Sequence, residues 1–151
     1  MRRALLDTNL LLLALVGEVA PERLGKAKRV RQFIFDHFNA LRSELKHCSA
    51  HVTSPHILAE ASNLIGSGDQ LIIDGLDQAL ASYILDVEEV YRPARDMVGD
   101  AGFWRVGLTD TVLLRMASDR VVLFTDDHAL FGMASSRGIE AVNILHGFTP
   151  R

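Results

Sequence analysis

Cysteine is nearly absent from this chain, which has a single one, Cys48, in 151 residues. One cysteine excludes an internal disulfide framework and any metal site built from several thiolates, and it favours a reducing compartment, the cytoplasm. For Cys48 itself we favour a small buried apolar side chain over a reactive thiol.

Long apolar runs are also missing. The longest near the N-terminus, residues 10–16, is far shorter than the roughly 20 residues that cross a bilayer, so we expect no membrane span. Asp7 and Asn9 lie just before that run and argue against a signal peptide. A buried strand followed by a buried helix explains this segment better.

An excess of positive charge is lacking too, since the formal net charge is −3. This argues against a protein that coats nucleic acid through bulk attraction, but not against a nuclease whose site concentrates acidic groups. One basic run stands out, and both a solvated helix face and a phosphate-gripping edge remain open for it. Its members are Arg23, Lys26, Lys28, Arg29 and Arg31.

The six histidines show no H-x-x-x-H or similar ligand spacing, so we expect no histidine metal site. Each is interpreted as a surface or core residue, although His128, next to Asp127, is placed where it could touch a substrate. For Trp104 core packing is the default, with base stacking or a dimer contact as the alternatives.

The composition, 48% apolar and 23% charged, is that of a soluble globular protein, and the length suits one domain over residues 1–151. Apolar patterning and turn residues predict alternating strands and helices. The expected strands are 4–6, 51–53, 121–124 and 141–145. The expected helices are 9–16 (ended by Gly17), a long one from Lys26 to about 45, one from Ser54-Pro55 to Gly66-Ser67-Gly68, 71–91 (with a strand near 84–90 as the alternative), 94–102, one capped by Thr109 or Asp110, and 127–136, stopped by Gly138.

This alternation predicts an α/β fold, a three-layer α/β/α sandwich around a mostly parallel sheet of four or five strands. In such sheets, ligands bind beyond the carboxyl ends of the strands. Asp7 follows the first strand and Asp127 follows the strand 121–124, so both would face this crevice if the two strands are neighbours.

Four acidic residues, Asp7, Glu60, Asp110 and Asp127, each lie against apolar sequence. An ionised carboxylate is costly there unless something compensates it, and a divalent metal is the simplest compensation. Oxygen ligands without histidine or cysteine suit Mg²⁺ or Mn²⁺ rather than zinc. Without metal, the crowded carboxylates should repel one another and raise some of their pKa values.

Simpler interpretations remain for each acid taken singly. Asp7, Asp110 and Asp126 could each cap a following helix, a common use of aspartate. Glu60 has no capping role open to it, and its alternative is a solvated position on an amphipathic helix. Glu60 is therefore the most discriminating of the candidates.

The acids and their neighbours resemble the motifs of PIN-domain ribonucleases, most like the VapC-type toxins of prokaryotic toxin–antitoxin pairs. Asp7-Thr8-Asn9 is similar to the opening motif, Glu60 to the helix acid, Asp110 in Leu-Thr-Asp to the third acid, and Thr125-Asp126-Asp127 to the Thr-x-Asp motif. On this resemblance Asp7, Glu60, Asp110 and Asp127 are catalytic and bind metal. Thr8, Asn9 and Thr125 would orient ligands or the attacking water, with Asp126 beside the ligands.

The resemblance, which covers nearly the whole chain, implies Mg²⁺- or Mn²⁺-dependent endonucleolytic cleavage of RNA by an activated water, leaving a 5′-phosphate and a 3′-hydroxyl. It also implies a homodimer and, for a toxin, a small antitoxin that blocks the site. A non-toxin PIN-like nuclease acting on RNA or structured DNA remains an alternative, as does a non-catalytic PIN-like interaction module. A phosphatase or receiver-like domain with Asp7 as nucleophile is disfavoured, because Asn9 stands where its second acid would be.

Overall fold

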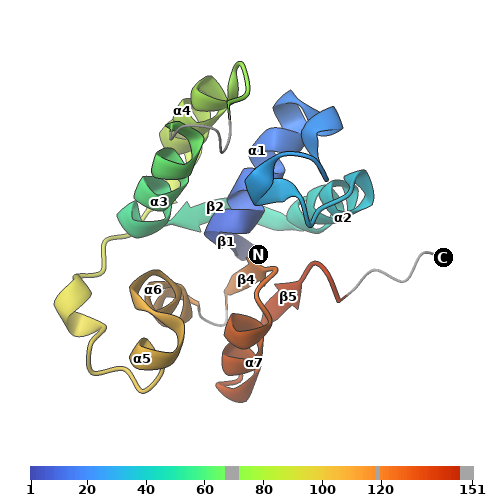
Figure 1. Ribbon diagram of the computed structural model, residues 1–151. Coiled ribbons are helices and arrows are strands. Elements are labelled where there is room, and N and C mark those ends of the chain that lie inside the picture. The colour runs from blue at the N-terminus through green and yellow to red at the C-terminus, as the bar shows by residue number, and fades with distance from the viewer. Residues whose placement is uncertain (67–71, 118–119, 147–151) are drawn as a thin grey trace.

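The computed structural model describes residues 1–66, 72–117 and 120–146 (Figure 1). Its centre is a five-stranded sheet in the order β3-β2-β1-β4-β5, and all four strand pairings are parallel. The strands are β1 (Arg2–Leu6), β2 (Cys48–Thr53), β3 (Glu88–Glu89), β4 (Val121–Thr125) and β5 (Ala141–Asn143). The predicted parallel sheet of four or five strands is confirmed.

Helices cover both faces of this sheet, which makes three layers. In Figure 1, α1, α2 and α4 lie above the sheet, and α5, α6 and α7 lie below it. The helices are α1 (Thr8–Val19), α2 (Phe35–Leu45), α3 (Pro55–Gly66), α4 (Leu76–Asp86), α5 (Phe103–Val106), α6 (Leu108–Met116) and α7 (His128–Ser136). Short 3₁₀ turns lie at η1 (Pro21–Arg23), η2 (Lys28–Val30) and η3 (Ala94–Asp96). The predicted three-layer α/β/α sandwich is confirmed.

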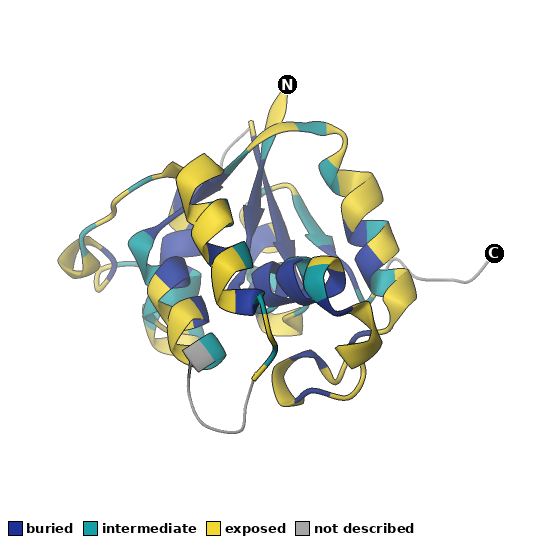
Figure 2. Ribbon diagram, turned by 90° about the horizontal axis from the view of Figure 1, so that it is seen from above, coloured by how far each residue is buried: buried dark blue, intermediate teal, exposed yellow. Residues whose placement is uncertain are grey.

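The core is built on β1, β4 and α1. Every residue of β4 is buried, as an unbroken apolar strand covered on both faces requires. Helix α1 is apolar nearly all round because it lies on the sheet and also packs against α2, α3 and α4 (Figure 2). Among the described helices, none has the length and apolar character needed to cross a bilayer.

The prediction of a long helix starting at Lys26 is wrong. The chain instead forms the 3₁₀ turn η2, becomes extended at Ile34 (φ −112°, ψ 168°), and only then enters α2. Hydrogen bonding explains the break: the Val30 carbonyl, which an α-helix would pair with Ile34, accepts the N–H of Gly25 at 3.1 Å. The Ile34 N–H is donated to Nδ1 of His37 at 2.9 Å.

Gly17 was expected to end the first helix, but α1 continues to Val19. Gly17 instead allows α1 and α2 to pack closely, because a Cβ at this position would lie 2.1 Å from the ring of Phe38 on α2. Gly138 does stop α7 as expected, with φ +69°, a conformation in which glycine costs least.

Several boundaries also differ from expectation. The region 71–91 holds both of its alternatives, α4 and then β3, whereas 94–102 has only the 3₁₀ turn η3 rather than a helix. The last strand is shorter than expected, and Cys48 is half-buried rather than buried. Helix α3 ends at Gly66, and the rest of its expected Gly66-Ser67-Gly68 stop, like Leu71, lies outside the described residues.

Candidate functional site

The carboxyl ends of β1 and β4 meet where the direction of the strand order changes. From β1 the chain proceeds outward to β2 and β3, then returns to β4 on the other side of β1. The N–H of Asp7 donates to the Phe124 carbonyl at 3.0 Å, which holds the two strand ends together. The two strands are neighbours, which is the condition under which both acids would face the crevice, and such a point is where open α/β sheets bind ligands.

One small pocket at this point, with a volume of about 180 Å³, brings the predicted acids together. All four acids line it, together with Thr8 and Asn9. Arg29 is the member of the basic run that reaches it; the other four are exposed side chains outside its lining. The full lining is Asp7, Thr8, Asn9, Arg29, Glu60, Asp110, Asp126 and Asp127.

Asp7 is the buried centre of this pocket, with 5% of its surface exposed. Its Oδ1 accepts the N–H of Leu10 at 2.8 Å and so caps α1, while Oδ2 accepts the hydroxyl of Thr125. The pKa of Asp7 is raised from 3.8 to about 8, chiefly by burial and then by the charge of neighbouring Asp126, while the Thr125 and Leu10 hydrogen bonds oppose the rise. Asp7 therefore caps α1 and also belongs to the acidic pocket.

Asp110 lies in the first turn of α6 and does not cap it. The capping position is Gly107, at φ +87°, which makes no side-chain cap, so the expected capping role of Thr109 or Asp110 is wrong. The pKa of Asp110 is raised from 3.8 to about 7, chiefly by burial and then by the charges of Asp127 and Glu60. This carboxyl therefore shares an electrostatic environment with acids from two other elements.

Glu60 and Asp127 are the exposed members of the set. Oε2 of Glu60 accepts the hydroxyl of Thr109 at 3.0 Å, which connects α3 to α6. Oδ1 of Asp127 accepts the N–H of Leu130 at 2.9 Å, so Asp127 caps α7 in place of Asp126. Asp127 also donates its N–H to the Thr125 hydroxyl at 2.9 Å.

Asp126 is held by two amide side chains rather than by a helix. Nδ2 of Asn9 lies 3.3 Å from each of its carboxylate oxygens, and Nε2 of Gln32 donates to Oδ2 at 3.1 Å. Gln32 was not predicted from the sequence, where no local pattern distinguishes it. It reaches the site because the chain turns after η2 instead of continuing as a helix. Thr109 was noticed only as a possible cap, although its position beside Asp110 could have suggested the contact with Glu60.

The donor chemistry of this pocket fits a hard divalent cation. All the acidic side chains of the lining offer oxygen atoms as metal ligands. Thr8 also lines the pocket, and its Oγ1 is buried and has no hydrogen-bond partner among the described atoms. The ligand set is not complete: within residues 1–66, 72–117 and 120–146, no three His, Cys, Asp or Glu side chains are arranged so that they could hold an ion. Donors of the protein itself hold the carboxylates in their present positions.

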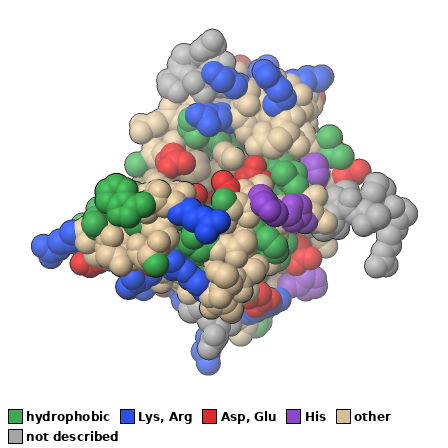
Figure 3. Space-filling view, turned by 60° about the horizontal axis from the view of Figure 1, so that its bottom comes forward, with side chains coloured by type: hydrophobic (Ala, Val, Ile, Leu, Met, Phe, Trp, Pro, Cys, Tyr) green, Lys and Arg blue, Asp and Glu red, His purple; other side chains and the backbone are tan. Residues whose placement is uncertain are grey.

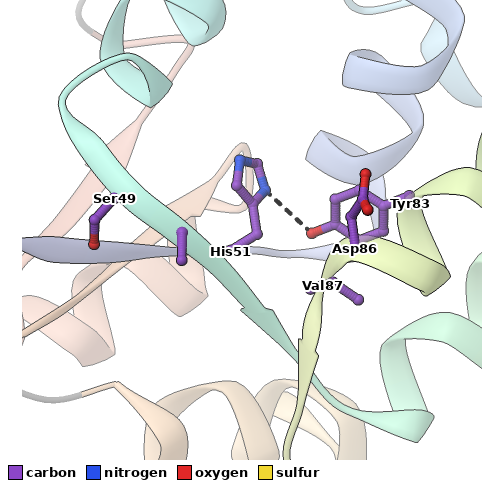
Figure 4. Close-up of a pocket in the computed structure, with 6 residues that line it drawn as sticks. Ser49, His51, Tyr83, Asp86 and Val87 are labelled. Carbon is purple, nitrogen blue, oxygen red and sulfur yellow. Dashed lines mark hydrogen bonds between the residues drawn. The ribbon is translucent and has the colours of Figure 1, made fainter.

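Two larger hollows lie away from the acids. The first, of about 370 Å³, lies between β2 and the end of α4, where Nδ1 of His51 is 3.3 Å from the hydroxyl of Tyr83 (Figure 4). Burial lowers the pKa of His51 and raises that of Tyr83, so both groups are favoured in their neutral forms. An adjoining hollow of about 510 Å³ between α1, α2 and α4 shares these two residues.

Comparison with known proteins shows the fold alone. Neither a protein-family model nor a curated protein matches the chain. A solved structure similar to it is described as a domain of a functionally unknown protein from Methanocaldococcus jannaschii DSM 2661, with a TM-score of 0.53 and 19% sequence identity. The similarity covers 94% of this chain and 90% of that one.

Proposed function

We propose that this chain is a Mg²⁺- or Mn²⁺-dependent endoribonuclease that hydrolyses RNA phosphodiester bonds at the acidic pocket. One observation carries the proposal: five carboxylates line a single pocket at the switch point of the sheet, and the most buried of them, Asp7, has its pKa raised to about 8. A buried carboxyl that resists ionisation in this way gains most from a bound dication. The buried, unpartnered hydroxyl of Thr8 supports the same assignment.

When bound, Mg²⁺ or Mn²⁺ would activate a water and polarise the phosphoryl oxygen. The chain supplies the rest. Thr125 and the Leu10 N–H fix both oxygens of Asp7, and Asn9 and Gln32 hold Asp126 beside it. Such supporting partners set the orientation of the carboxylates that would bind the ion.

Arg29 is the basic side chain that lines the pocket, and we assign it to the substrate phosphate. A guanidinium matches the geometry of phosphate oxygens and remains charged at all working pH values. The fold brings it there from η2, whereas Asp7 and Asp126 directly follow β1 and β4. This gives the basic run a phosphate contact through one of its members.

The proposal extends to the toxin of a toxin–antitoxin pair, acting as a homodimer and blocked by a small antitoxin. This extension is supported by the motif resemblance. On α4, Leu85 is 85% exposed and Ile84 lies beside it, and exposed apolar side chains of this kind are often covered by a partner. Light scattering of the purified chain tests the dimer directly.

The test of the proposed activity is cleavage of a mixed RNA pool in Mn²⁺, with Asp7→Asn and Glu60→Gln compared against wild type. Both variants should lose about 100-fold or more in rate, because even residues that only support a metal ligand contribute about 10–100-fold. Glu18→Gln is the matched control, since Glu18 lines the hollow between α1, α2 and α4. Its cleavage rate should equal that of wild type.

Thermal melting with and without Mn²⁺ accompanies the assay, because a ligand that binds only the folded chain must raise its Tm. A wild type that neither cuts nor gains Tm in Mn²⁺ overturns the proposal and favours a PIN-like interaction module. Cleavage of structured DNA in preference to RNA keeps the nuclease and corrects its substrate.

A further inference from the structure

Three aromatic rings lie together on α7 and the turn after β5, starting at the residue that follows Asp127 of the acidic pocket. His128 follows the pocket residue Asp127, and its ring centroid is 5.3 Å from that of His146, with the rings inclined at 62°. The ring of Phe131 lies 5.9 Å from that of His146, at 84°. We call His128, Phe131 and His146 the ring cluster.

The ring cluster is assembled from two separate parts of the chain. His128 and Phe131 are three residues apart on α7 and therefore share one face of that helix. His146 lies in the turn after β5, where its own N–H donates to the Asn143 carbonyl at 3.2 Å. The side chain of Asn143 tightens this turn by accepting the N–H of Leu145 at 3.0 Å. This hydrogen-bonded turn therefore positions His146 against α7.

Core packing does not account for the ring cluster, because His128 and His146 are both exposed and only Phe131 is half-buried. In an edge-to-face contact one ring presents its rim to a single face of the other, so the remaining faces are not covered by the pair. On the face shown in Figure 3, histidine side chains gather next to acidic ones. The ring cluster therefore has exposed ring surface that a ligand could contact.

We propose that the ring cluster is a stacking platform for an unpaired base of the nucleic acid whose phosphate occupies the acidic pocket. The identity of that phosphate as the cleaved one rests on the proposed function. Aromatic side chains hold bases of single strands by stacking on their flat faces. Consecutive Cα atoms lie about 4 Å apart, so His128 is within reach of a nucleotide adjoining Asp127.

Charge favours this source of affinity. The chain carries a net charge of −3, and five carboxylates line the pocket, so bulk attraction cannot hold a polyanion there. Stacking supplies affinity without demanding positive charge. It also selects single strands, because the faces of a base inside a duplex are already covered by its neighbours.

The test measures binding of a single-stranded RNA that carries 2-aminopurine, whose fluorescence is quenched when the base stacks. Glu60→Gln serves as the background in Mg²⁺, so that the RNA is not cut. Adding His128→Ala and His146→Ala together should weaken binding by about 5- to 150-fold and remove the quenching, in line with stacking energies. His47→Ala is the matched control, since His47 is exposed and precedes β2 at the opposite end of the strands. It should change neither readout.

Replacing both histidines by phenylalanine separates stacking from hydrogen bonding and also guards against a misfolded alanine variant. The phenylalanine pair should keep binding and quenching near the background level. Loss of binding in that pair, or full quenching in the alanine pair, overturns the platform.

The nuclease proposal fails separately. A wild type that does not cut RNA in Mn²⁺ but still shows ring-dependent quenching retains the platform and loses the enzyme. A wild type that cuts, with KM unchanged by His128→Ala and His146→Ala, retains the enzyme and loses the platform.

Discussion

The acidic pocket and the hollow around His51 and Tyr83 are opposites in size and in charge. The hollow has about twice the volume of the pocket, roughly 370 Å³ against 180 Å³. Its titratable pair is pushed by burial toward neutral forms, and the two groups satisfy one another through a hydrogen bond. In the pocket, burial acts on carboxyls that also face other carboxyls.

This difference indicates in which of the two regions the polar groups already have the partners that they need. A neutral hydrogen-bonded pair needs no further partner, whereas a set of crowded carboxylates gains additional stability from protonation or from a cation. Size alone would select the hollow rather than the acidic pocket.

The pH dependence of stability should be dominated by Asp7. Its carboxyl holds a proton in the folded chain up to about pH 8 but in the unfolded chain only up to about pH 4. Unfolding therefore releases a proton between these values, and the metal-free free energy of unfolding should fall by a few kcal/mol as pH rises from about 4 to about 8. Urea unfolding in EDTA at a series of pH values measures this.

Asp7→Asn supplies the control, because asparagine caps a helix as well as aspartate does but does not ionise. The variant should show a shallower pH profile, since Asp110, with its pKa raised to about 7, still contributes. At pH 8 its metal-free form should be more stable than wild type. A wild-type stability that is flat or rises across this window contradicts the raised pKa.

Removing one acid from each region should separate them functionally. Asp110→Asn should abolish most of the Mn²⁺-induced rise in Tm and lower cleavage by about 100-fold, because it removes a pocket carboxylate. Asp86→Asn, in the lining of the hollow around His51 and Tyr83, should leave both measurements unchanged. Equal effects of the two substitutions would mean that the Mn²⁺ response is not specific to the pocket.

The sequence was sufficient for the architecture and for the acids. Unbroken apolar strands and Ser-Pro or Asp starts of helices are local signals, and the polar residues after 6 and 124 lie at neighbouring strand ends once the sheet forms. The same signals placed Asp7, Glu60, Asp110 and Asp127 in one pocket.

The rest depends on contacts between distant segments. The apolar spacing of Val30, Phe33 and Phe38 is helical, yet the Gly25 N–H takes the Val30 carbonyl and breaks the helix. That break brings Gln32 and Arg29 to the pocket. Gly17 resembles a helix stop in sequence, and only the position of Phe38 shows it to be a packing residue.

Around the larger hollows, the stability of the fold should depend on the volume of the substituted side chain rather than on its charge. Gly17→Ala places a Cβ 2.1 Å from the ring of Phe38, which lines the hollow between α1 and α2. Overpacking typically costs about 1–3 kcal/mol, more than the roughly 1 kcal/mol that alanine gains over glycine in a helix. We therefore expect a net loss of stability in urea unfolding.

Gly132→Ala on α7 is its matched control, because a Cβ there meets nothing within 4 Å. That variant should gain stability, by up to about 1 kcal/mol. Opposite signs for two glycine-to-alanine changes in helices would demonstrate the packing cause. The Mn²⁺-induced rise in Tm should be the same in both variants as in wild type.

The smallest effect should come from Tyr83→Phe, which removes the hydroxyl next to Nδ1 of His51 and little else. The loss of one such hydrogen bond should lower the free energy of unfolding by about 0.5–1.5 kcal/mol. Thr125→Val removes a hydroxyl of similar kind from beneath Asp7, and it should lower the Mn²⁺ affinity as well, because that hydroxyl holds a carboxylate oxygen of the pocket. Isothermal titration with Mn²⁺ distinguishes the two. If Tyr83→Phe also changed the Mn²⁺ affinity, the hollow and the pocket would be coupled through α1. The statement that the His51–Tyr83 pair is independent of the acidic pocket would then be wrong.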